Sequence, residues 1–276
     1  MLVLDKLNVV ERPVKSNTTL GIYSRYDGNL AGGALVGIGM ALSGACPGTV
    51  LVQLAQGIPS ANLTAAGAII GAGTYVKTKH LFAHQAKSDA RPDTIARRAT
   101  ISEVSNIPEP ALYLLFGAAI AVLLRFTQTG ATSTLVAPIL GGLLISSAQA
   151  VSLLLTSSPL GASTAYEQVS RKIIQAFEGS WKQLELPHRS IIFSLGVIAG
   201  SATLLQQSST PGYSAVESSI PAVHAFFGGV VLAFGARLAG GCTSGHGLSG
   251  MSAMSFSSLV TVVGMFGAGI LTRWLM

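Results

Sequence analysis

The chain has 276 residues, of which 49% are hydrophobic and 10% are charged, and its mean hydropathy is +0.56. Because a soluble domain carries about 25% charged residues, this composition excludes an ordinary water-soluble protein and indicates a polytopic membrane protein. The formal net charge of +6 does not indicate a nucleic-acid partner, since the cations are divided among the segments between apolar stretches. Residues 1–17 are mixed and charged, so we expect no signal peptide and insertion into the lipid bilayer through the chain's own spans.

Apolar stretches long enough to be membrane-spanning helices occur along the whole chain. The seven predicted spans are residues 30–45, 62–79, 107–126, 133–156, 188–207, 220–241 and 257–275. At 1.5 Å per residue the first covers about 24 Å, less than the ~30 Å hydrocarbon core, so it either tilts little or ends inside the membrane. The predicted fold class is therefore all-α, a membrane protein with about seven transmembrane helices.

The segments between the spans predict the orientation and the domain organisation. Residues 1–29 are expected to form a loosely ordered cytoplasmic tail, and residues 30–276 a single transmembrane domain. Most of the 17 basic residues fall on the side of the N-terminus, many of them in the loop 77–106, whereas the loop 208–219 has none. The positive-inside rule then places the N-terminus in the cytoplasm and the C-terminus outside.

An amphipathic helix is predicted near residues 164–185. Thr164 followed by Glu167 has the spacing of a capping box. Apolar residues then recur at helical spacing, namely Val169, Ile173, Phe177, Trp181 and Leu184. This pattern fits a helix that lies at the cytoplasmic membrane interface, and equally a helix that packs within the protein.

The chain contains an internal repeat with an offset of 196 residues. Residues 30–45 (LAGGALVGIGMALSGA) match 226–241 (FFGGVVLAFGARLAGG), and each copy runs into one of the two cysteines, Cys46 and Cys242. Span counting gives the first and sixth spans opposite directions, so the halves, around 30–126 and 188–276, form an inverted repeat like those of pseudo-symmetric transporters. Small-residue spacings such as Gly33–Gly37 are assigned to close helix packing.

A helix break is predicted after the first cysteine. Cys46 is followed by Pro47 and Gly48 and then by the apolar run 49–56, which includes the candidate Thr49. Proline is tolerated at the first position of a helix, so Cys46 is expected at the N-cap of a short re-entrant half-helix.

A second break is predicted after the second cysteine. Cys242 is followed by Thr243, Ser244, Gly245 and His246, and both Thr243 and Ser244 are natural N-caps. Non-helical backbone at membrane depth persists only where protein buries it or where it lines a polar cavity. The two cysteines therefore mark two broken helices.

Two half-helix N-termini could bind a small anion between them. The free amides and the positive end of the helix dipole attract negative charge. A neutral thiol is a weak donor that suits a soft, polarisable acceptor such as an anionic sulfur. Gly44, Gly240 and Gly241 would allow close approach of backbone and substrate. The candidate pathway residues are Cys46, Pro47, Gly48, Thr49, Arg237, Gly241, Cys242, Thr243, Ser244, Gly245 and His246.

Several other interpretations of these residues remain open. The two cysteines could be packing residues or could form a disulfide across the repeat. Arg237 within a span is a functional candidate, or it snorkels or caps a carbonyl. His246 could gate, donate to the anion, or be a satisfied polar group. Cys242 and His246 alone fall short of a tetrahedral metal site, so no metal or cofactor is expected. No carboxylate lies deep in a predicted span, which favours passive conduction or an uncoupled carrier.

The segment GARLAGGCTSGHGLSG (235–250) resembles the signature of the YeeE/YedE family, a sulfur-transport family whose characterised members take up thiosulfate. ALVGIGMALSGACPGTVLVQLAQG (34–57) resembles the equivalent segment of the family's first half. The resemblance implies an inverted-repeat helical fold with re-entrant helices, and Cys46 and Cys242 as two of the cysteines along a thiosulfate path. The family's transporters use a third cysteine nearer the outside, and this chain has two.

The preferred hypothesis is therefore a transporter, not an enzyme, that takes up a small sulfur-containing anion, with thiosulfate as the first choice. Its expected location is the plasma membrane, as a multi-pass protein. The alternative is a membrane sulfur-relay protein in which a cysteine carries a persulfide. A scaffold without a ligand is a third possibility.

Overall fold

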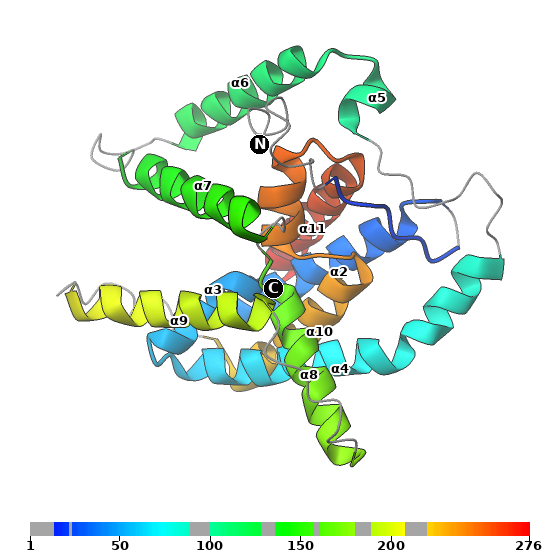
Figure 1. The fold of residues 1–276 in the computed structure, drawn as a ribbon, viewed down its shortest axis with the longest axis vertical. Helices are drawn as coiled ribbons and strands as arrows, with labels where there is room; N and C mark the ends of the chain where they lie inside the picture. Colours follow the sequence, from blue (N-terminus) through cyan, green and yellow to red (C-terminus); the bar gives the residue numbers. More distant parts are fainter. Residues whose placement is uncertain are drawn as a thin grey trace.

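The computed structural model describes residues 14–21, 24–88, 100–127, 136–156, 161–179, 189–207 and 220–276 (Figure 1). The regular elements within these residues are helices, and one isolated antiparallel bridge joins Thr100 to Ser255. The helices are α2 (Asp27–Ser43), α3 (Pro47–Ala55), α4 (Pro59–Ser88), α5 (Ile101–Ser105), α6 (Glu109–Thr127), α7 (Val136–Thr156), α8 (Ser163–Phe177), α9 (Arg189–Gln207), α10 (Ala222–Leu238), the π-helix η4 (Thr243–Gly250) and α11 (Phe256–Leu275).

Four helices form the centre of the molecule. Helix α2 packs against both α10 and α11, and α10 also packs against α4. Helix α8 covers α4, α9 and α10, while α3 contacts α4 and α9. Figure 1 shows α6 and α7 set apart from these central helices. Their outward faces expose leucines such as Leu114 and Leu143, as expected of helices that contact lipid or another subunit.

The contacts between α2 and α10 are reciprocal. A Cβ on Gly39 would lie 2.6 Å from the backbone nitrogen of Leu232, and a Cβ on Gly235 would lie 2.8 Å from that of Val36. Residues 39 and 235, and likewise 36 and 232, are equivalent under the offset of 196. The contact of Gly39 with Leu232 is therefore repeated by the equivalent contact of Gly235 with Val36. Two repeat copies related by a two-fold axis would show this exchange.

Glycines also bring α11 close to α2 and α4 close to α10. A Cβ on Gly33 would lie 2.5 Å from the carbonyl oxygen of Thr261 in α11, and Gly229 of α10 meets the carbonyl oxygen of Thr64 in α4 in the same way. Gly37 likewise faces the carbonyl oxygen of Met265. The assignment of Gly33 and Gly37 to close helix packing is confirmed.

A helix occupies each of the seven stretches that the hydropathy predicts as spans, with shifted bounds. By length and composition, three described segments could cross a membrane, namely Asp27–Ala55, Arg189–Gln206 and Phe256–Leu275. The bent pair Ala222–Leu238 and Thr243–Gly250 could make a fourth. The count of seven spans stays a prediction. The predicted loop 77–106 is wrong at its start, because α4 continues to Ser88.

The prediction of a loosely ordered tail is wrong for residues 14–21, which we call the N-terminal strap. The backbone nitrogen of Thr18 donates to Asn29 Oδ1 at 2.7 Å, and that of Leu20 donates to Asp27 Oδ1 at 2.6 Å. These bonds attach the strap to the first turn of α2. Residues 1–13 and the predicted external loop 208–219 lie outside the described residues.

Helix α8 is the predicted amphipathic helix, but its start is not a capping box. The N-cap is Ala162 and makes no side-chain cap, because Thr164 and Glu167 point toward α10 instead. Tyr166 near the start of α8 is buried in the protein, while Phe177 at its end is 88% exposed. The first half of the helix therefore packs on the bundle, and its C-terminal end extends beyond it. Its location at the membrane interface stays a prediction, and Trp181 and Leu184 lie outside the described residues.

We expect Gly39→Ala and Gly235→Ala each to lower the free energy of unfolding by about 1–3 kcal/mol, because the new methyl group meets backbone of the facing helix. Gly117→Ala in α6 is the control, since no heavy atom lies within 4 Å of its Cβ position. The midpoint of thermal unfolding in detergent is measured for all three variants. Equal midpoints for Gly39→Ala and Gly117→Ala would contradict the packing of α2 on α10.

Candidate functional site

The first break separates α2 from α3. Gly44 ends α2 with a φ of +66°, a left-handed conformation that favours glycine. Cys46 is the N-cap of α3: the backbone nitrogen of Thr49 donates to its sulfur at 3.4 Å, and the backbone nitrogen of Cys46 donates to Thr49 Oγ1 at 2.7 Å. Pro47 occupies the first position of the helix. The predicted role of Cys46 as an N-cap is confirmed.

The second break separates α10 from η4, without the side-chain cap of the first. Gly240, which is equivalent to Gly44, also has a positive φ of +77°. Cys242 is the N-cap of η4, so the prediction that Thr243 or Ser244 caps this helix is wrong. The Cys242 sulfur lies 3.1 Å from Ser244 Oγ, and the axes of α10 and η4 differ by 46°. Both cysteines are thus the N-cap of a short helix that follows a break, and the second of these breaks bends the chain.

Polar groups surround the Cys242 sulfur. Ser244 Oγ lies 3.1 Å from it, with either group able to donate, and Ser163 and the backbone of Gly245 are further polar neighbours. Ser163 opens α8, so the site combines a helix of the second repeat with one from the middle of the chain. A sulfur surrounded by donors is the kind of environment that also stabilises an anionic sulfur.

The two thiols differ in exposure. Cys242 is 0% exposed and packs against Val36, Leu232 and Met265, whereas Cys46 is partly exposed. Both are free cysteines, so the disulfide alternative is wrong. A solute that reaches Cys242 therefore requires a rearrangement of the residues around it.

His246 stabilises the second break through two hydrogen bonds. Its side chain is fully buried, with Nε2 2.9 Å from the carbonyl oxygen of Ala239 and Nδ1 2.9 Å from Ser258 Oγ. A carbonyl only accepts, so Nε2 carries the hydrogen and Nδ1 accepts from the serine hydroxyl. Both ring nitrogens are engaged, which places His246 as a satisfied polar group. Gly241 allows this, since a Cβ there would lie 3.0 Å from Nε2.

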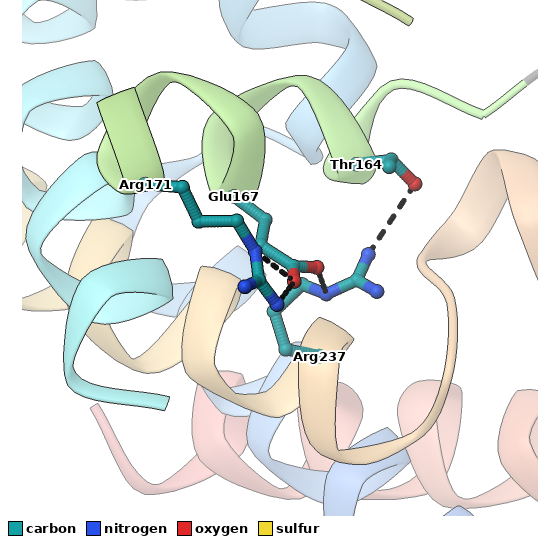
Figure 2. A network of polar contacts seen from close by, with 4 residues as sticks. All are labelled: Thr164, Glu167, Arg171 and Arg237. Carbon is teal, nitrogen blue, oxygen red and sulfur yellow. Dashed lines mark hydrogen bonds and ion pairs between the residues drawn. The ribbon is translucent and has the colours of Figure 1, made fainter. Parts of the chain in front are cut away.

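Arg237 is paired rather than free, as Figure 2 shows. Its Nε lies 2.6 Å from Glu167 Oε2, and its Nη1 donates to Thr164 Oγ1 at 3.3 Å. Arg171 holds the other oxygen of the same carboxylate, with Nε at 2.9 Å. The guanidinium of α10 therefore ties α8 to the bundle. The sequence signal for half of this network was present, because Glu167 and Arg171 are four residues apart on a helix.

Helix α8 contacts both breaks, which the sequence did not predict. The buried hydroxyl group of Tyr166 donates to the carbonyl oxygen of Pro47 at 2.8 Å, beside Cys46. The backbone nitrogen of Ala162 donates to Ser244 Oγ at 3.4 Å, beside Cys242. The start of α8 thus lies between the two helix breaks.

Of the remaining candidates, Thr49 is exposed while Gly48 and Thr243 are half-buried around the same breaks. The structure therefore brings the predicted residues together at two helix N-termini. It sets apart Arg237, which faces Glu167, and His246, which faces Ala239 and Ser258.

We expect Glu167→Gln to lower the free energy of unfolding by about 3 kcal/mol. The substitution removes the charged partner of the Arg237 guanidinium, whose side chain is largely buried. Arg171→Gln is the matched control and should change it by less than about 1 kcal/mol, since that side chain is 40% exposed. Thermal unfolding in detergent compares the two. If Arg171→Gln proves the more damaging, the Glu167–Arg237 pair does not hold α8 in place.

The family described as sulphur transport matches residues 2–271 of the chain. A comparison with curated proteins finds no significant match. Since the family match covers nearly the whole sequence, including both cysteine segments and α8, the chain belongs to the sulphur transport family.

Proposed function

We propose that the protein carries a small sulfur-containing anion, thiosulfate, inward across the plasma membrane. The observation that carries the proposal is the pair of helix breaks, each with a cysteine as the N-cap of a short helix. Membership of the sulphur transport family supports a sulfur compound as the substrate. The repeat is inverted in this proposal, with α3 and η4 as re-entrant helices, the N-terminus cytoplasmic and the C-terminus external.

The chemistry of the breaks suits an anion with a soft sulfur atom. The first amides of α3 and η4 have no carbonyl of their own helix to bond, and the helix dipole adds a positive field at the same point. The donors at the Cys242 sulfur would serve equally for a substrate sulfur that takes its place among them. A thiol that stays neutral donates a weak hydrogen bond, which allows the anion to leave again.

The path in this proposal runs from Cys46 to Cys242. Cys46, partly exposed, lies toward the external end, and the buried Cys242 lies toward the cytoplasm. The anion passes from one thiol to the other through S–H···S contacts, with no covalent bond formed or broken. Tyr166 and the start of α8 stand between the two, so α8 must shift when the anion passes.

The absence of the family's third cysteine is compatible with this path. The chain has two cysteines, and hydroxyl groups supplement them: Thr49 at the first break, Ser163 and Ser244 at the second. We propose that these hydroxyls provide the remaining donors to the anion's oxygens.

Cys242→Ser should reduce thiosulfate uptake into proteoliposomes about tenfold or more, the equivalent of roughly 1.4 kcal/mol of lost transition-state contact. Cys46→Ser should act in the same direction. Because serine is smaller and keeps a donor, both variants should insert and unfold at temperatures close to that of the wild type. Undiminished uptake by Cys242→Ser would refute the role of the thiol.

Intact mass measurement of the wild-type protein after exposure to thiosulfate tests whether the transfer is non-covalent. We expect two unmodified thiols, because no step of the proposed path breaks the sulfur–sulfur bond of the substrate. A stable adduct on Cys46 or Cys242 that a reductant removes would contradict the hand-over by hydrogen bonds alone.

A further inference from the structure

The N-terminal strap brings a cation to the second helix break. The carbonyl oxygen of Lys15 accepts hydrogen bonds from Ser255 Oγ and Ser257 Oγ, both at 3.0 Å, which fix the backbone of the strap at the start of α11. The ammonium nitrogen of the half-buried Lys15 lies 3.9 Å from the position that a Cβ on Gly245 would occupy. Gly245 is in the first turn of η4, the helix that begins directly after Cys242.

The strap is held by side chains of two elements, α2 and the start of α11. Asn29 of α2 accepts from the backbone of Thr18 and donates to Thr261 Oγ1 of α11 at 3.0 Å and to the carbonyl oxygen of Ala239 at 3.3 Å. Asn29 is fully buried, so these bonds form away from solvent. Lys15 is therefore not on a free tail, and its backbone position does not depend on its own side chain.

The charges around this break do not balance within the described residues. Lys15 and Arg237 are two cations close enough to repel each other. Among the described residues, Glu167 is the carboxylate that pairs with Arg237, and it also pairs with Arg171. The N-terminal amides of η4 add a further positive field, and a cation beside a helix N-terminus is unfavourable. A bound anion would remove this excess of positive charge.

We propose that Lys15 is a substrate-binding residue, whose ammonium holds the oxygen atoms of the sulfur anion while its terminal sulfur meets Cys242; this inference depends on the proposed transport function. The class of ligand is a dianion with one soft sulfur and hard oxygens at its other end. Thiosulfate has both ends, and an ammonium is a hard donor that forms charge-assisted hydrogen bonds with such oxygens. Lys15 thereby selects for charge, and Cys242 for sulfur.

The test is transport kinetics in proteoliposomes with Lys15→Met, Lys15→Arg and the control Lys77→Met. Lys77 is an exposed lysine of α4, so its loss removes the same charge away from the break. Lys15→Met should raise the KM for thiosulfate at least about fivefold with little change in unfolding temperature, because the strap is held by backbone and by other side chains. Lys15→Arg should restore the KM, and Lys77→Met should leave it unchanged.

Thiocyanate, a monoanion with a soft sulfur, provides a second readout that a merely structural role would not move. Lys15→Met should raise the inhibition constant of thiocyanate by a smaller factor than it raises the KM for thiosulfate. If Lys15→Met fails to insert, Lys15→Gln takes its place with the same expectation. An unchanged KM, or an equal loss for both anions, would overturn the assignment of Lys15. A wild-type protein that does not transport thiosulfate would instead refute the proposed function, and the assignment with it.

Discussion

The structure depends on satisfying the backbone where two helices break among apolar residues. In the proposed arrangement both breaks lie within the membrane, where lipid supplies no hydrogen-bond partners, so each amide or carbonyl at a break must find one within the protein. Cys46 and Thr49 bond each other's backbone at the first break, and His246 bonds the carbonyl oxygen of Ala239 at the second. The amides that remain at the first turns of α3 and η4 are the part of this arrangement that can serve an anion.

Helix α8 connects this backbone requirement to the rest of the bundle. It bonds Pro47 through Tyr166, Ser244 through its own N-terminal backbone, and Arg237 through Glu167. These contacts join both breaks to one helix, so a movement of α8 would affect the surroundings of both cysteines together. The close glycine packing of α2 on α10 leaves those two helices little freedom, which makes α8 the element better placed to move.

The sequence predicted the features that depend on local chemistry. The proline after Cys46 indicated a helix start, and the repeat of small residues indicated close packing, because both signals act over a few residues or at a fixed period. It failed where a side chain chooses between a local and a distant partner. Thr164 and Glu167 have the spacing of a capping box, yet both bond Arg237, which is remote in sequence. Lys15 was missed for the same reason, since nothing near it in the chain links it to Gly245.

The central claim is that a sulfur anion binds at the two cysteine-capped breaks. The rate at which a maleimide alkylates Cys46 and Cys242 in the purified protein, resolved for each cysteine by peptide mass spectrometry, tests it most directly. Thiosulfate should slow the alkylation of both thiols, and sulfate at equal ionic strength should not, because only thiosulfate offers a soft sulfur to the thiol. Equal alkylation rates with thiosulfate and with sulfate would contradict the account.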